Sequence, residues 1–445
     1  MAENDPYTRV RVESILGPLF VGYRVLEFRG GTVFRGPISF YCEAHRAEVE
    51  RGMRHLPGGY CFERMDGTTY LTYTLPAPTF RPTNASLHLS LFFATVLTTL
   101  LAGASLRQPP ADAEEGPDNL PGNYCFHEGS MPREARGLLP GMALQAIGKL
   151  SPLGLSIPGG LSGPVAEASS LPCGLLEELG FNLRWARGSG SLAEAFRRLF
   201  VLGGPFSLAI LLILGSHELG HYVMARRYGM LVTPPFFLPA PIPPIGTFGA
   251  VIKMRSPMLH RRALLDIGLA GPLAGLAVAF PFLIYGILHS RFEMVRYWEK
   301  DGNLYFGNSV LTWGLTRLLA GPPPTGYMLD WLSHPFAWAG WIGLLVTSLN
   351  LIPVGQLDGG HVAYALVGRR QHLVAYFVVG MLLALAHRWP GWMLWCVIMV
   401  TVMRLAHPPV AIEDVALGPG RRALGWLALL LFLLLFMPAP VSGVF

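Results

Sequence analysis

The chain has 445 residues, of which 51% are hydrophobic and only 14% are charged, and its mean hydropathy is +0.41. A soluble globular domain carries about 25% charged residues, so this composition excludes an ordinary soluble protein and predicts several membrane spans. The formal net charge is +6, but basic loops serve membrane topology. No basic run is interleaved with aromatic residues, so no nucleic-acid partner is expected.

The first 85 residues are predicted to form a separate small soluble domain of α+β type. Extended segments flank a Gly-Gly break, a short helix is expected within 42–56, and an Asp-Gly turn at 66–67 joins two aromatic-rich and Thr-rich runs. The N-terminus lacks the basic and apolar regions of a cleavable signal peptide. We therefore expect internal spans to direct membrane insertion.

About seven transmembrane helices are expected, which makes the rest of the chain an all-α polytopic membrane protein. A span needs roughly 20 predominantly apolar residues. The candidate stretches lie at 87–106, 199–222, 264–288, 336–353, 372–387, 391–406 and 423–438. A metal or catalytic function inside such stretches would show as polar side chains, because ionisable groups in a span are rare and usually functional.

A long segment at 107–198, rich in Pro, Gly and Ser, separates the first two spans and contains no clear span itself. It is predicted to be an extracytoplasmic insert, where Cys125 and Cys173 either pair or remain two unrelated thiols. The expected domains are then an N-terminal domain, the first span, this insert, a core and C-terminal helices. Their bounds are 1–85, 87–106, 107–198, 199–370 and 371–445.

The charge of the short loops predicts the orientation. Every charged residue of 226–262 is basic, so this loop is expected in the cytoplasm, whereas 289–334 carries mixed charges and is expected outside. Seven spans then place the N-terminal domain in the cytoplasm. The protein is expected to be a multi-pass protein of the inner or plasma membrane of a bacterium.

The sequence "HELGH" at 217–221 lies at the cytoplasmic end of the second span. His217 and His221 are four residues apart on a helix, so both imidazoles project from one face and can bind one metal ion. Glu218 projects beside them and can take a proton from a water molecule on that metal. The alternative is a pair of histidines facing the lipid headgroups, with Glu218 extended to water.

A third ligand is expected in "SLNLIPVGQLDGG" at 348–360. Pro353 and the glycines break the helix, and irregular backbone at membrane depth occurs only in protein or beside water. Asp358 is the carboxylate there, and the orientation places it on the same side as His217; otherwise it belongs to an ordinary cytoplasmic turn. Asn350 either contacts the substrate or oxyanion or makes an interhelical hydrogen bond.

Three further polar residues have open interpretations. His361 either supports the site from behind or is a loop histidine. Asp266, near the start of the third span, either favours the positive end of its helix or contacts a metal ligand. His407 is grouped with the other histidines near span ends, which are expected at the membrane interface.

The motifs "HELGH", "LAGPLAG" and "NLIPVGQLDGG" resemble, in order and spacing, the site-2 proteases, which are intramembrane zinc metalloproteases. The resemblance covers about 200–370. Gly355 and Gln356 stand where the family usually has further prolines. The N-terminal "FRGG" and "YLTYTLP" are similar to the EGY-like branch of plastid and cyanobacterial type.

The segment "GTFGAVIKMRSP" at 246–257 also resembles this family, whose chain forms a short β-structured segment after the first motif. The resemblance implies that Gly246, Thr247, Phe248 and Gly249 bind the substrate through an open strand edge. The alternative is a plain amphipathic hairpin in the cytoplasm.

The resemblance implies a zinc metalloendopeptidase that cleaves transmembrane segments of membrane proteins. One Zn²⁺ per chain would be held by His217, His221 and Asp358, and Glu218 would be catalytic. The expected partners are a transmembrane protein substrate and membrane lipid, and the oligomeric state is open. Two alternatives are a membrane metal transporter, which would repeat such ligands across the bilayer, and a catalytically inactive scaffold.

Overall fold

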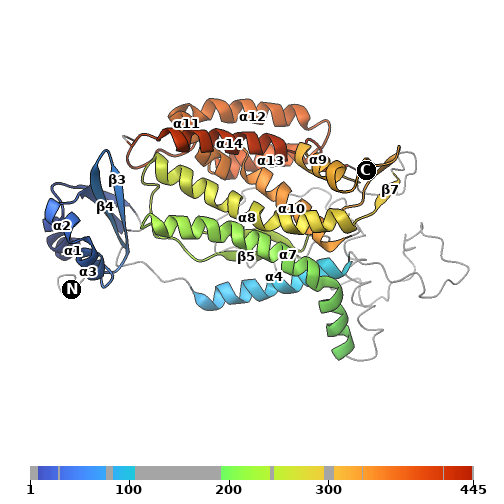
Figure 1. The fold of residues 1–445 in the computed structure, drawn as a ribbon, viewed down its shortest axis with the longest axis horizontal. Coiled ribbons are helices and arrows are strands. Elements are labelled where there is room, and N and C mark those ends of the chain that lie inside the picture. Colours follow the sequence, from blue (N-terminus) through green and yellow to red (C-terminus); the bar gives the residue numbers. More distant parts are fainter. Residues whose placement is uncertain are drawn as a thin grey trace, which may run out of the picture. The chain divides into compact units, whose positions relative to one another are not determined.

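The computed structural model describes residues 9–28, 31–76, 84–105, 192–240, 245–294, 305–332, 334–413 and 415–442 (Figure 1). The insert expected at 107–198 lies almost wholly outside these residues. Its extracytoplasmic place, and the pairing of Cys125 with Cys173, therefore stay predictions.

The N-terminal region contains a four-stranded antiparallel sheet with short helices packed against it. Its strands are β1 (Arg24–Phe28), β2 (Gly31–Pro37), β3 (Gly59–Met65) and β4 (Thr68–Pro76), in the spatial order β1-β2-β4-β3. Its helices are α1 (Arg9–Leu16), η1 (Gly17–Leu19), α2 (Phe40–Ala44) and α3 (Arg46–Met53). Asp66 and Gly67, both with positive φ, form the tight turn between β3 and β4. Phe34, Leu71 and Tyr73 are fully buried beneath the helices.

Three helices in the described part of the chain are long and apolar enough to cross a membrane. They are α4 (Ala85–Ser105), α7 (Leu192–Arg227) and α8 (Arg261–His289). They coincide with the stretches expected at 87–106, 199–222 and 264–288. The described residues are therefore mostly helical with an N-terminal α/β region, which agrees with the expected membrane protein.

The other four expected spans also fall on helices, but these are shorter than the roughly 20 residues that a span needs. They are α10 (Pro335–Asn350), α12 (Gln371–Leu385), α13 (Gly391–Ile398) with the π-helical turn η4 (Met399–Met403), and α14 (Pro419–Leu435). The count of about seven spans is therefore not confirmed. In the described residues, α9 (Val310–Leu319) precedes α10, and α11 (Asp358–Val367) and η3 (Gly368–Arg370) lie between α10 and α12.

Helix α8 packs against α7, α10 and α11, and Figure 1 shows α7 and α8 running side by side. Leu276, Ala279 and Leu283 of α8 join the largest buried apolar cluster, together with Trp338 and Trp341 of α10. Three small antiparallel pairs complete the fold. They are β5 (Phe236–Pro239) with β6 (Thr247–Val251), β7 (Phe292–Met294) with β9 (Tyr327–Leu329), and β8 (Tyr305–Phe306) with β10 (Val441–Ser442).

The N-terminal sheet also contacts the helical core. Val33 of β2 and Cys61 of β3 share a buried apolar cluster with Ala225 and Tyr228, which follow the histidines of α7, and with Ile267 of α8. The sheet therefore packs on the same ends of α7 and α8 that approach the candidate site.

Candidate metal centre

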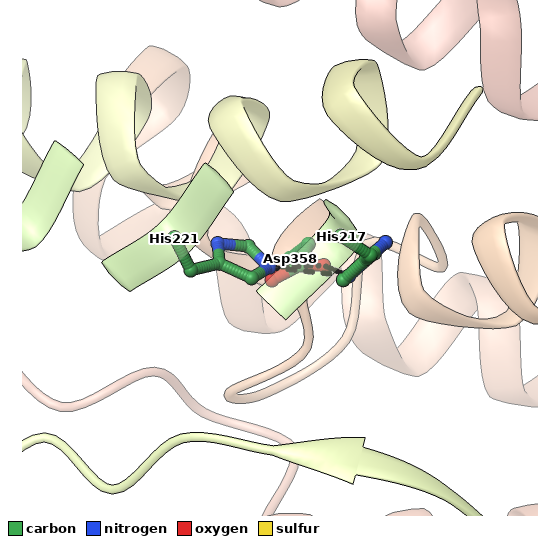
Figure 2. Close-up of side chains that lie close together, drawn as sticks. All are labelled: His217, His221 and Asp358. Atoms are coloured by element: carbon green, nitrogen blue, oxygen red, sulfur yellow. Dashed lines mark hydrogen bonds and ion pairs between the residues drawn. The ribbon is translucent and has the colours of Figure 1, made fainter. Parts of the chain in front are cut away.

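His217 and His221 project from one face of α7, and their Nε2 atoms are 3.2 Å apart (Figure 2). Both residues are buried. The helix continues through the motif because Leu, Ala and Met residues around it favour helix, and Arg226 and Arg227 in its last turn favour the negative end of the helix dipole. The local sequence thus presents two imidazole nitrogens to one point.

Asp358 is the first residue of α11. Its Oδ2 atom lies 3.3 Å from the Nε2 atom of His217 and 3.3 Å from that of His221 (Figure 2). Possible ligand atoms of the three residues all lie within 4.8 Å of one another. The chain therefore brings two imidazoles together with a carboxylate that lies 137 or more sequence positions after them.

The orientation of His221 is set by a helix carbonyl. The Nδ1–H group of His221 donates a hydrogen bond of 2.7 Å to the carbonyl oxygen of Ile267 in α8. Because one nitrogen carries the proton, the Nε2 atom of the neutral ring has a free lone pair that points toward Asp358. Such a hydrogen bond is the usual way in which proteins hold a metal-binding histidine.

Close approach of α7 and α8 depends on a glycine. A Cβ atom at Gly271 of α8 would lie 2.1 Å from Nε2 of His221, and one at Gly275 would lie 3.1 Å from Cβ of His217. The "LAGPLAG" segment thus leaves room for the two imidazoles between the helices.

The donor set fits a zinc ion. The lone pairs of His221 Nε2 and of the Asp358 carboxylate face each other at 3.3 Å, and two acceptors at that distance repel unless a cation or a proton lies between them. Zinc binds imidazole nitrogen and carboxylate oxygen, and catalytic zinc sites use three protein ligands. His217, His221 and Asp358 would hold the ion and leave one position open for a water molecule or the substrate.

Glu218 is buried next to the three ligand residues. It interacts electrostatically with His221 and Asp358 and accepts a hydrogen bond from the backbone of Ile252, which directly follows β6. This contact fixes a carboxyl group between the metal ligands and the strand. A carboxyl group placed there can exchange a proton with a group bound at the metal.

Asn350 lies at the C-terminal end of α10, and its Nδ2 atom is 3.3 Å from Nε2 of His217. The expectation that this amide lies at the site therefore agrees with its position. The contact is interhelical in the structure, and the same amide can face a ligand at the site, so both interpretations remain compatible with its geometry.

The segment around Gly246 forms one strand of a two-stranded ribbon in the described residues, with β6 paired to β5 along one edge only. Gly246 and Gly249 have positive φ values of 75° and 100°, and Thr247 donates a hydrogen bond of 2.9 Å to the carbonyl oxygen of Leu238. Phe248 projects outward and is 68% exposed. The expected β-structured segment is present, and no described strand pairs with its second edge.

The structure gives Asp266, His361 and His407 specific partners, and it places His361 in α11, so the alternative of a loop histidine is wrong. Asp266 makes a two-pronged ion pair with Arg421 of α14, at 2.9 and 2.8 Å, and accepts a hydrogen bond from Tyr228. It therefore connects α8 to α14 and to Tyr228, which directly follows α7, and neither expectation included these contacts. His407 is buried, 7% exposed, and its Nε2 atom lies 2.7 Å from Nδ1 of His361 in α11. His407 therefore packs against the helix that carries Asp358, and its expected place at the membrane interface stays a prediction.

His217, Glu218 and His221 lie on α7, a helix of membrane-spanning length, and Asp358 begins the ten-residue α11. Two histidines and a carboxylate with an adjacent glutamate are the arrangement found in zinc peptidase centres. Residues 205–386 match the model of peptidase family M50, and this segment contains all three ligand residues. The predicted resemblance to the site-2 proteases is confirmed by this match.

Several of the curated proteins that the chain resembles are named EGY, which confirms the predicted resemblance to the EGY-like branch. The chain is 32% identical over 254 residues to the "Probable zinc metalloprotease EGY2, chloroplastic" of Arabidopsis thaliana, covering 56% of this chain and 45% of the relative. The protein of the same name from Oryza sativa subsp. indica is 35% identical over 159 residues, covering 36% and 28%. The "Probable zinc metalloprotease EGY1, chloroplastic" of Arabidopsis thaliana is 29% identical over 242 residues, covering 53% and 42%.

The chain thus spans less than half the length of each of these relatives. No solved structure matches the fold.

Proposed function

We propose that this protein is an intramembrane zinc metalloprotease that hydrolyses peptide bonds in or near transmembrane segments of other membrane proteins. The observation that carries the proposal is the convergence of His217, His221 and Asp358 within 4.8 Å. The match to peptidase family M50 and the names of the relatives support it.

Each residue of the site has a separate proposed role in the hydrolysis. Bound zinc would supply Lewis-acid chemistry, lowering the pKa of water to about 7 and polarising a carbonyl group. Glu218, held by the backbone of Ile252, takes the proton from the attacking water and delivers it to the leaving amine. Asn350, next to His217, donates its amide hydrogen bond to the substrate carbonyl.

The substrate must be extended at the cleavage point, because a helix hides its peptide bonds in its own hydrogen bonds. We assign its binding to β6, where Gly246, Thr247, Phe248 and Gly249 precede the backbone that contacts Glu218. An unwound substrate segment would add to the free edge of this strand. The contact between Ile252 and Glu218 supports this assignment, since it places the strand beside the catalytic carboxyl group.

The membrane arrangement of the protein is part of the same proposal. It has about seven spans, a cytoplasmic N-terminal domain at 1–85 and a site near the cytoplasmic surface. The basic charge of the 226–262 loop supports the orientation. The division into an insert at 107–198, a core at 199–370 and C-terminal helices at 371–445 follows from the same spans. We propose that the membrane is the inner or plasma membrane of a bacterium. The names of the relatives instead assign those proteins to the chloroplast.

The substitution Glu218→Gln tests the proposed catalysis. The amide keeps the volume and the contact with the strand but cannot transfer the proton, so cleavage is expected to fall by about 100-fold or more. Zinc content per chain should stay unchanged. Both quantities are measured on purified protein in lipid vesicles with a panel of single-span membrane proteins, and Glu413→Gln, at an exposed ion pair with Arg369, is the control.

Cleavage by Glu218→Gln at the wild-type rate would contradict the proposed role. Zinc-dependent transport across the vesicle membrane, with no cleavage by the wild type, would instead favour a metal transporter.

A further inference from the structure

The turn between α10 and α11 carries Asp358 and has an irregular, buried backbone. Helix α10 ends at Asn350 and α11 begins at Asp358, and Pro353, Val354 and Gly355 between them are all buried. Backbone groups outside regular structure need hydrogen-bond partners when they are buried. The position of Asp358 therefore depends on what satisfies this turn.

Gln371 provides some of the hydrogen bonds that this turn needs. This glutamine is the first residue of α12 and is 1% exposed. Its Nε2 group donates to the carbonyl oxygens of Pro353 and Leu405, both at 3.3 Å. Its Oε1 atom accepts a hydrogen bond of 3.1 Å from the backbone N–H of His407. One buried amide thus joins the Asp358 turn to a segment about 50 residues further along the chain.

The segment 403–408 supplies the other contacts. The backbone N–H of Gly355 donates to the carbonyl oxygen of Leu405 at 3.2 Å. A Cβ atom at Gly355, whose φ is 55°, would lie 2.0 Å from the carbonyl oxygen of Arg404. Only glycine fits this position, and so the departure from the family's proline pattern at Gly355 matches a direct backbone contact between the two segments.

The imidazole of His407 reaches α11 itself. The Nδ1 atom of His407 faces the carbonyl oxygen of Pro408 and therefore carries the proton. The Nε2 atom must then accept a hydrogen bond, which His361 donates from its Nδ1–H at 2.7 Å. His361 lies one helical turn after Asp358. The first turn of α11 is thus held from the same segment that holds the preceding loop.

We propose that Gln371 and His407 are positioning residues for the third metal ligand: together they hold the turn and the first helical turn on either side of Asp358. The inference rests on the proposed zinc site. His407 and Leu405 lie beyond residues 205–386, so the C-terminal part of the chain completes a site whose ligands all come from the family-matched segment.

The test measures metal binding rather than cleavage. Gln371→Met and His407→Phe keep most of the volume of each side chain and remove its hydrogen bonds. The zinc dissociation constant of the full chain is measured by competition with a chelator, and the visible absorption spectrum is recorded after loading with cobalt. Both variants are expected to bind zinc about 10-fold or more weakly and to show altered cobalt bands, because the carboxylate is no longer held in place.

His372→Met is the matched control, because His372 is half-buried, is adjacent to Gln371 in α12 and contacts the carbonyl oxygen of Arg369 and the ring of Tyr376 rather than the Asp358 turn. It should bind zinc like the wild type. Thermal unfolding of the metal-free proteins distinguishes loss of the fold from loss of the site. If Gln371→Met does not fold, the zinc affinity and cobalt spectrum of His407→Phe test the proposal, because this variant keeps the glutamine.

A wild-type dissociation constant together with a wild-type cobalt spectrum in His407→Phe or in folded Gln371→Met would overturn the proposal. Absence of stoichiometric zinc binding by the wild type would instead overturn the metal centre of the proposed function.

Discussion

Single residues determine whether the metal centre can form between α7 and α8. His221 is oriented by the carbonyl oxygen of Ile267, and its ring occupies space that any side chain at Gly271 would need. An imidazole that carries its proton on Nδ1 offers Nε2 to a metal. The site therefore depends on the absence of a side chain at Gly271 as much as on the ligand residues.

Gly271→Ala is expected to weaken zinc binding. The added Cβ atom would lie 2.1 Å from Nε2 of His221, so the ring must turn away or the helices must separate. We expect the affinity for zinc to fall by about 10- to 100-fold, the range for residues that orient metal ligands, as measured by chelator competition. Gly204→Ala on α7, where an added Cβ atom has no neighbour within 4 Å, should leave the affinity for zinc unchanged. Equal zinc affinities for the two variants would contradict the proposed role of Gly271.

At the scale of elements, the β5–β6 ribbon brings a strand to the catalytic carboxyl group. The backbone after β6 contacts Glu218, and within the described residues the second edge of β6 has no strand partner. An unpaired edge is able to bind an extended peptide through backbone hydrogen bonds, and side chains beside it add selectivity.

Phe248→Ala is expected to lower kcat/KM for cleavage of a membrane protein by about fivefold or more, since truncating an aromatic contact at an interface often removes about 1 kcal/mol or more of binding. The change should appear mainly in KM, with zinc content unaffected, because Phe248 is exposed and is not one of the three proposed metal ligands. Leu318→Ala, at an 80% exposed position in α9, is the control. A rise in KM of equal size in the control would show that surface apolarity, not the strand, is responsible.

At the scale of the whole molecule, a buried polar network connects the N-terminal sheet to α8. His260 precedes α8 and accepts a hydrogen bond from the backbone N–H of Ala263 on Nδ1, while Nε2–H donates to Glu63 of β3 at 2.8 Å. Arg35 of β2 donates to the same Glu63 oxygen at 2.9 Å. The ring of His260 must be neutral to fill both roles, because a proton on Nδ1 would remove the helix cap.

The pKa values of this network agree with that geometry. Burial lowers the pKa of His260 from its ordinary value near 6.5, with help from the charges of Arg35 and Arg262, although Glu63 opposes it. Burial alone would raise the pKa of Glu63, but the hydrogen bond and charge of His260 and the guanidinium of Arg35 outweigh it, so the pKa of Glu63 is lowered. Both groups therefore contribute stability that is complete above about pH 6.5 and is lost as the pH falls.

The thermal unfolding temperature of the wild type is accordingly expected to decrease as the pH is lowered from about 7 to about 5. In this range His260 binds a proton more readily in the unfolded protein than in the folded protein. His260→Asn keeps a side chain that can cap α8 but does not titrate, so its unfolding temperature should change less over this range. Measurements in detergent, without added metal, check this. An identical pH dependence in the two proteins would rule out His260 as its source.

The sequence alone determined the features that depend on local spacing and composition. It located the apolar stretches that became α4, α7 and α8, the α/β character of the N-terminal region, and the facing of His217 and His221, because hydrophobic length and helical periodicity are properties of neighbouring residues. The broken motif around Pro353 and the charge of the loops also indicated Asp358 as the third partner, and the structure has these three residues in one cluster.

The tertiary structure alone decided which groups support that cluster: the carbonyl oxygen of Ile267, the space at Gly271, and the contacts of Gln371 and His407 with the Asp358 turn. The contact between His407 and His361 could not be predicted, because a histidine near a span end carries no local sign of its distant partner. These contacts join residues up to about 50 positions apart, and the packing of helices against one another, which periodicity does not encode, brings them together.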